Sequence, residues 1–117
     1  MSTETYSEYL MPTYEENVAG YPELKQQIEK KKRRVLEHPY HYAEGLGPGK
    51  WRNLKGLRSV HMMGGKYVFL VAICEDCIRN GHLEINLQRC GDICTQEELK
   101  RVVFFAFGKH DLTYGKL

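Results

Sequence analysis

Hydrophobic and polar residues alternate along parts of this chain with the period of a β-strand. The predicted strands are residues 5–11, 57–63, 67–73 and 101–107. Pro12 ends the first strand, and the glycines at 64 and 65 predict a hairpin turn between the second and the third. The third strand is almost continuously apolar and should be central in a sheet, and the fourth is another core strand.

Helical patterns follow the first strand. Thr13 and Glu16 have the spacing of a capping box, which predicts a short helix that stops at Gly20. Residues 21–39 predict a longer helix, with Pro22 in its first turn and a second proline at its end.

The longer helix should pack on the sheet through one apolar stripe. The residues of this stripe are Leu24, Ile28, Val35 and Leu36. Lys31 and Lys32 interrupt it, and we expect their stems to lie along the apolar surface while their charges reach water.

The rest of the chain follows neither period. Residues 40–56 are rich in glycine and predict a loop, and residues 74–100 predict an irregular segment with a short extended piece at 82–87. The element order is β-α-α-β-β-insert-β. This order is typical of an α+β domain with helices on one face of a small sheet. We therefore expect a single domain over residues 1–117, with a cysteine-rich insert at about 74–100.

Composition agrees with a cytoplasmic globular protein. Apolar residues make up 42% and charged residues 27% of the chain. No apolar run approaches the roughly 20 residues that span a bilayer, and the first ten residues lack the pattern of a signal peptide. We expect no membrane partner.

Charge is distributed unevenly. Residues 1–20 carry a net charge of −4, residues 21–61 carry +6 and residues 62–117 are neutral, which together give +2. A basic middle third suits RNA, DNA or an acidic protein partner. The alternative is an ordinary solvated helix face rich in lysine.

The insert contains all four cysteines, in the pattern C-x2-C-x12-C-x3-C. They are Cys74, Cys77, Cys90 and Cys94. Two thiol pairs at this spacing resemble a zinc ribbon or knuckle, in which four sulfur ligands close a structural site; His82 could replace one ligand. Free thiols and disulfides remain the alternatives.

Three stretches together resemble the RelE/ParE toxin superfamily. They are "LEHPYHYAEGLGPGKWRNLKGLRSV" (36–60), "GGKYVFLVAI" (64–73) and "VVFFAFGKHDLTY" (102–114). The resemblance implies a small antiparallel sheet with two N-terminal helices packed on one face. It also implies the toxin of a toxin–antitoxin system that cleaves mRNA on the ribosome, and an antitoxin protein as partner.

The chemistry that this resemblance implies needs no metal cofactor. The ribose 2′-OH attacks the adjacent phosphate, cations stabilise the charge that develops, and an acid protonates the departing 5′-oxygen. The implied catalytic residues are His110, Tyr114, Arg58 and His61. The implied RNA-binding residues are Lys50, Arg52, Lys55, Lys66 and Lys109.

The sequence departs from the family at Val68, where an arginine is common in strand three. Two alternative functions stay open at this point. The first is a ParE-like inhibitor of DNA gyrase, and the second is a non-catalytic, zinc-stabilised domain that binds RNA or protein.

Overall fold

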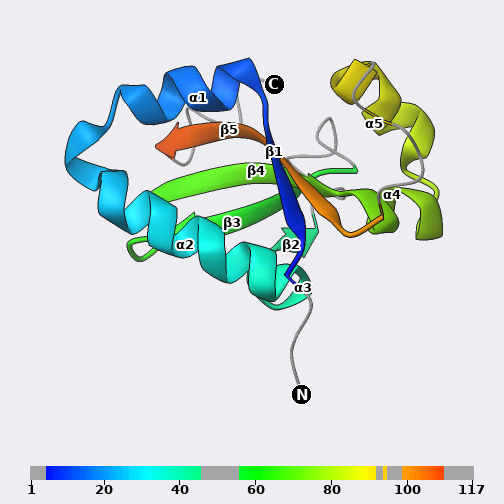
Figure 1. The fold of residues 1–117 in the computed structure, drawn as a ribbon, viewed down its shortest axis with the longest axis horizontal. Coiled ribbons are helices and arrows are strands. Elements are labelled where there is room, and N and C mark those ends of the chain that lie inside the picture. Colours follow the sequence, from blue (N-terminus) through cyan, green and yellow to red (C-terminus); the bar gives the residue numbers. More distant parts are fainter. Residues whose placement is uncertain (1–4, 46–55, 92–93, 95–98, 110–117) are drawn as a thin grey trace.

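The two most apolar runs of the chain form neighbouring antiparallel strands inside the sheet. We describe the fold from a computed structural model, which covers residues 5–45, 56–91, 94 and 99–109. The strands are β1 (Ser7–Leu10), β2 (Glu44–Gly45), β3 (Arg58–Met62), β4 (Tyr67–Ile73) and β5 (Arg101–Lys109), in the sheet order β1-β5-β4-β3-β2 (Figure 1). The α+β prediction is confirmed.

The sheet is mixed, which corrects the expectation of an antiparallel one. Strands β2, β3, β4 and β5 pair antiparallel, but β1 runs parallel to β5, with Ser7 opposite Arg101 and Leu10 opposite Phe104. A parallel pair needs a long crossover connection. Here the crossover contains nearly all the other elements, which sequence periodicity alone does not reveal.

Helices cover one face and one end of the sheet. They are α1 (Pro12–Ala19), the short 3-10 helix η1 (Pro22–Leu24), α2 (Lys25–Glu37), α3 (Pro39–Tyr42), α4 (Cys74–Arg79) and α5 (Leu83–Cys90). Helices α1 and α2 lie on the same face of the sheet, whereas α4 and α5 lie beyond its end (Figure 1). Among the described residues, no helix has the length and apolar character needed to cross a membrane.

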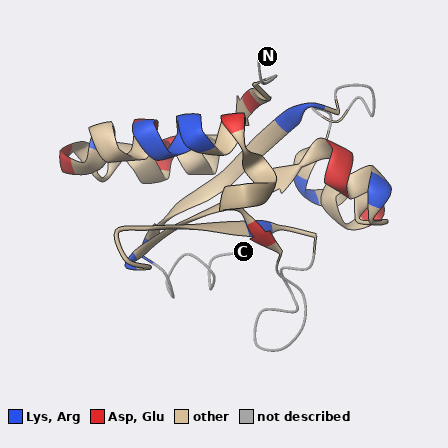
Figure 2. Ribbon diagram, turned by 90° about the horizontal axis from the view of Figure 1, so that it is seen from below, with Lys and Arg blue, Asp and Glu red and all other residues tan. Residues whose placement is uncertain are grey.

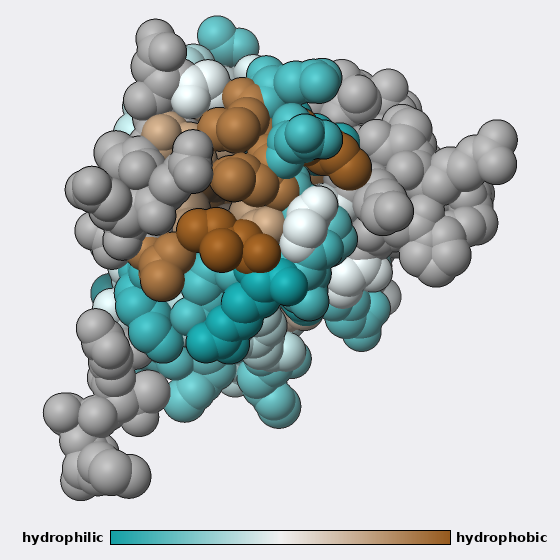
Figure 3. All heavy atoms as spheres, turned by 90° about the vertical axis from the view of Figure 1, so that its right-hand side faces the viewer, coloured by the Kyte–Doolittle hydropathy of each residue, from teal (hydrophilic) through white to brown (hydrophobic). Residues whose placement is uncertain are grey.

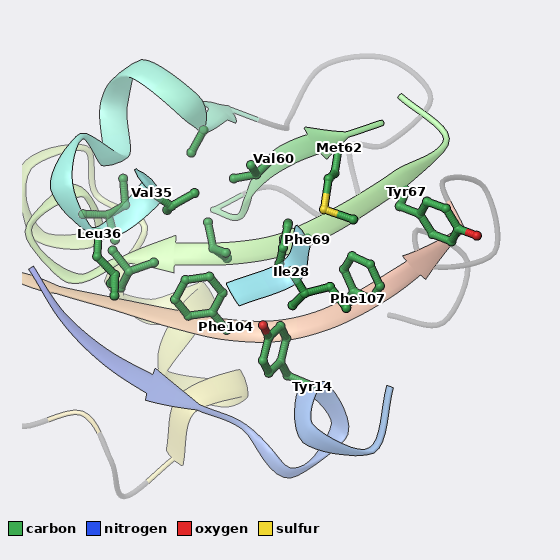
Figure 4. Packing of buried hydrophobic residues seen from close by; sticks show 14 of the residues in the cluster. Tyr14, Ile28, Val35, Leu36, Val60, Met62, Tyr67, Phe69, Phe104 and Phe107 are labelled. Atoms are coloured by element: carbon green, nitrogen blue, oxygen red, sulfur yellow. The ribbon is translucent and has the colours of Figure 1, made fainter. Parts of the chain in front are cut away.

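The face under α1 and α2 holds the larger hydrophobic core. The predicted stripe Leu24, Ile28, Val35 and Leu36 is buried in it, as expected. Tyr14 from α1 packs against Phe69 and Phe104, with ring centroids 6.2 and 5.4 Å away (Figure 4). These large apolar side chains account for much of the stabilisation, since each contributes about 1.5–3 kcal/mol when buried.

The opposite face of the sheet holds a second apolar cluster. Its strand residues include Val68, Leu70 and Ala72 of β4, which alternate with the residues of the first core. A bulge in the β4–β5 ladder between Leu70 and Val71 adds one residue to β5. Phe105 and Ala106 therefore both belong to this second cluster.

Helix α1 differs from its prediction at the N-terminus. It begins at Pro12, and its N-cap residue Met11 makes no side-chain capping bond, so Thr13 is not the cap. A proline suits the first helical position because its missing N–H needs no acceptor there.

Lys32 differs from its prediction as well. Its residue surface is only 8% exposed, and its ammonium pairs with Glu8 and Glu29, each at 3.1 Å. The charge that was expected in water instead links β1 to α2, because two carboxylates replace the lost hydration.

Helices occur in two segments for which no helix was predicted. Residues 40–56 were expected to form a loop, yet α3 and the two-residue strand β2 occupy the described part of it. The insert was expected to be irregular, with an extended piece at 82–87, but it forms α4 and α5. Leu83 and Leu87 alternate like strand residues but are also four apart, so they lie on one helix face.

Candidate nucleic-acid-binding site

His61 lies in a row of residues that crosses three strands near the hairpin end of the sheet. It pairs with Val68 on β4, and Val68 pairs in turn with Gly108 on β5. Val68 belongs to the cluster opposite α1 and α2, so its row neighbour His61 points to that face as well. The half-buried imidazole lies beside the hairpin turn. Its Cδ2 atom is 3.9 Å from the point where a Cβ atom would stand if Gly65 carried a side chain.

Two exposed lysines stand beside this row. Lys109 ends β5 and pairs in register with Tyr67, and Lys66 precedes Tyr67 in the hairpin turn. The ammonium of Lys66 lies 5.9 Å from the centre of the Tyr67 ring. Tyr67 belongs to the core under α1 and α2, so Lys109 starts from that face, whereas His61 points to the opposite one. The two cations and the imidazole therefore share one end of the sheet and lie on either side of it. This combination can neutralise a phosphate and exchange a proton.

Arg58 is not part of this group. It is three residues before His61 on β3, so its side chain points to the opposite face of the sheet. Its guanidinium donates two hydrogen bonds to the Asp76 carboxylate, at 3.0 and 3.1 Å, and one to the carbonyl of Ala43 at 3.0 Å. The guanidinium is thus engaged in attaching α4 to the sheet, and the catalytic role of Arg58 stays a prediction.

Several predicted residues lie outside the described part of the chain. They are Lys50, Arg52, Lys55, His110 and Tyr114. Their roles remain predictions. In the sequence His110 directly follows Lys109, the last residue of β5.

Val68, at the position where the family commonly has an arginine, is fully buried. It packs among the apolar residues of the second cluster, where an unpaired charge would be strongly unfavourable. The departure from the family pattern therefore coincides with an apolar environment on this face.

The basic middle third of the sequence divides between two regions. Lysines and arginines colour much of α2, which lies on one side of the sheet (Figure 2). Lys31 of this helix stacks on the ring of Tyr42 at 5.2 Å, and Lys32 forms the ion pairs described above. These α2 residues lie on the face opposite His61. Lys32 is buried in ion pairs and Lys31 covers an aromatic ring, so neither belongs to the candidate site.

Two buried acids on α4 were not singled out by the sequence. Glu75 accepts a hydrogen bond from the Tyr6 hydroxyl and lies 3.7 Å from the Lys100 ammonium, while Asp76 binds Arg58. Burial by itself would raise the pKa of both carboxyls, but these hydrogen bonds and cations outweigh it and lower the pKa of each. The acids attach α4 to its surroundings as carboxylates.

The four cysteines lie around one small cavity between α4, α5 and the sheet. All four have free thiols. The cavity measures about 20 Å³, and its lining includes Cys74, Cys77, Cys90 and Cys94. Burial raises the pKa of the Cys90 thiol to about 12. Within the described residues, no three His, Cys, Asp or Glu side chains already stand in an arrangement that could hold a metal ion.

Comparison with known proteins now places the fold. No family model matches the sequence, and no curated protein matches it significantly. Among solved structures, the chain is similar to one in the crystal structure of the toxin–antitoxin complex RelBE2 from Mycobacterium tuberculosis. The two chains are 17% identical and superpose with a TM-score of 0.59, over 91% of this chain and 99% of the other. The two chains share one fold, which is RelE-like.

In this chain the α4–α5 insert follows β4 directly. The sequence-based resemblance is confirmed for the fold. The activity has to be argued from the side chains, since one fold supports many functions.

Proposed function

We propose that this protein is the toxin of a toxin–antitoxin system and that it cleaves mRNA. The observation that carries the proposal is the placement of His61, Lys66 and Lys109 at the sheet end where β5 leads into His110 and Tyr114. The RelE-like fold supports it. Each residue type has a task in phosphodiester cleavage, and together they need no metal ion.

In this proposal the two imidazoles divide the proton transfers. One accepts the proton of the ribose 2′-OH as it attacks the adjacent phosphorus, and the other protonates the 5′-oxygen as the P–O bond breaks. Lys66 and Lys109 stabilise the additional negative charge on the phosphorane. Tyr114 would stack on a base or position the scissile phosphate.

Expression in a bacterial host tests the activity. Induction should arrest growth, and mapping of mRNA 5′ ends should reveal new cleavage sites in translated messages. Co-expression of a cognate antitoxin should suppress both effects. Growth arrest with intact mRNA and altered plasmid supercoiling would contradict the proposal and favour a gyrase inhibitor.

Lys66→Gln should weaken RNA binding in a salt-dependent manner. Loss of one phosphate contact should reduce the slope of log K against log salt concentration by about 0.7, the value expected per contact on a single strand. Fluorescence anisotropy with a labelled single-stranded RNA at several salt concentrations measures this slope.

The control for Lys66 is Lys30→Gln. Lys30 is exposed on α2, on the face of the sheet opposite His61, and its loss removes the same charge. The control should leave the slope unchanged. Equal slopes for the two variants would mean that RNA does not contact the hairpin end.

A further inference from the structure

The α4–α5 insert buries almost no hydrophobic side chain. In α5 the single buried residue is Asn86, and in α4 the buried residues are Glu75, Asp76 and Cys77. Apolar side chains of this region remain at the surface instead: Ile78 is 44% and Leu99 40% exposed. Figure 3 views the molecule from the side of α4 and α5 and shows an apolar patch there. The hydrophobic effect that fixes α1 and α2 therefore contributes little to fixing α4 and α5.

The four thiols line one cavity between α4, α5 and the sheet, where a bound ion would attach both helices to the sheet. Cys74 begins α4 directly after β4, Cys77 is one turn further, and Cys90 ends α5. Cys94 follows α5, and its backbone N–H donates to the carbonyl of Gly91 at 3.4 Å. All four line the same cavity. Its volume of about 20 Å³ exceeds the roughly 10–15 Å³ that one water-sized sphere occupies.

The polar groups around this cavity donate to sulfur. The Asn86 Nδ2 group donates to Cys77 Sγ at 3.0 Å, and the Arg101 Nε–H donates to Cys74 Sγ at 3.4 Å. A neutral thiol is a weak acceptor, whereas a metal-bound thiolate accepts strongly and is commonly oriented by such donors.

The local charges complement a tetrathiolate zinc site. Such a site has a net charge of −2, since one divalent ion is bound by four thiolates. Arg101 contacts Cys74, and Arg89 lies near enough to Cys77 and Cys90 to interact electrostatically. Arg89 also donates to the side-chain oxygen Oδ1 of Asn86 at 2.6 Å, and this bond fixes the amide whose Nδ2 group faces Cys77. The two guanidinium groups would balance the charge of the site.

We propose that Cys74, Cys77, Cys90 and Cys94 bind one zinc ion that attaches α4 and α5 to the end of the sheet. His82, the alternative ligand, does not line the cavity. Zinc binding would draw the thiols closer together than they stand in this structure, to Zn–S distances of about 2.3 Å. Four Zn–S bonds form as four thiol protons pass to solvent, so no redox partner is required. This structural role is independent of the proposed RNA cleavage.

Elemental analysis of the purified full-length chain, with any affinity tag removed, tests the proposal. One zinc ion per chain is expected, and Cys77→Ser and Cys90→Ser should each abolish its retention through dialysis. His82→Gln is the matched control and should keep the full zinc content. Loss of zinc in the His82 variant would overturn the four-cysteine ligand set.

Two further measurements on the unmodified sequence keep the test decisive if the serine variants fail to fold. Replacement of zinc by cobalt(II) should give sulfur-to-cobalt charge-transfer bands and the intense visible bands of a tetrahedral site. Removal of the metal with a chelator should abolish hydrogen-exchange protection in α4 and α5 while the amides of β4 stay protected. A folded, metal-free protein with four freely titrating thiols, or with disulfides detected by mass, would overturn the proposal.

Discussion

His110→Ala should slow mRNA cleavage by about 10²–10⁴-fold, the usual contribution of a general acid or base. In the proposed mechanism His61 and His110 each carry out one proton transfer, and removing one imidazole leaves its transfer to water. The rate is best measured in a translation extract, by primer extension on a defined message. Growth arrest on expression should be relieved in parallel.

The control for this variant is His38→Gln. His38 is an exposed histidine that caps the C-terminus of α2, away from the row that contains His61. It should cleave at the rate of the unmodified protein. If His110→Ala together with Tyr114→Phe were still fully toxic, the proposed site would have to be abandoned.

Arg58→Met should lower the free energy of unfolding by about 3–5 kcal/mol, the cost of leaving a buried partner charge uncompensated. The Asp76 side chain is only 5% exposed and accepts two of the three hydrogen bonds that the guanidinium donates. Without Arg58, Asp76 keeps the Asn80 amide as a donor but has lost its cation. Urea denaturation followed by circular dichroism measures the change.

Two further variants separate this ion pair from general effects. Arg79→Met removes a cation from the same helix, but the Arg79 side chain is 73% exposed and lies 3.8 Å from Glu75; its loss should cost at most about 1 kcal/mol. The double variant Arg58→Met with Asp76→Leu should recover much of the lost stability, because no charge is then left buried. Equal destabilisation by Arg58→Met and Arg79→Met would refute the structural role of Arg58.

The same pair predicts an acid-dependent loss of stability. Although burial opposes it, Arg58 lowers the pKa of the Asp76 carboxyl in the folded protein. A lowered pKa stabilises the fold at pH values above the ordinary aspartate pKa of about 3.9. This contribution disappears as pH falls through the folded-state pKa. Asp76→Asn should therefore flatten the acid side of the stability profile.

Sequence patterns predicted elements well where one side of the element is buried in a single large core. The stripe from Leu24 to Leu36 and the run Tyr67–Ile73 were interpreted correctly for this reason. Sequence patterns were less informative in segments where few apolar side chains are buried. The insert gives its helices few hydrophobic contacts, so the alternation at 82–87 gave no basis for preferring a helix.

The candidate site shows a different limit of sequence-based reasoning. Position on β3 made both Arg58 and His61 candidates, but alternation sends them to opposite faces, and only the structure reveals Asp76 as the partner of Arg58. Lys32 is a similar case, since its carboxylate partner Glu8 is 24 residues away. Long-range charge partners are set by tertiary packing, which local spacing does not encode.

The parallel pairing of β1 with β5 also determines when this molecule can fold during synthesis. Strand β5 lies between β1 and β4, yet it is the last of the described strands to be synthesised. Until then β1 has no neighbour, and Phe104 and Phe107 are missing from the core beneath α1. Contacts between such distant segments slow folding. A nascent chain that lacks β5 therefore cannot assemble the sheet end that holds Lys66 and Lys109, so the proposed RNA-binding surface forms only after β5 has been synthesised.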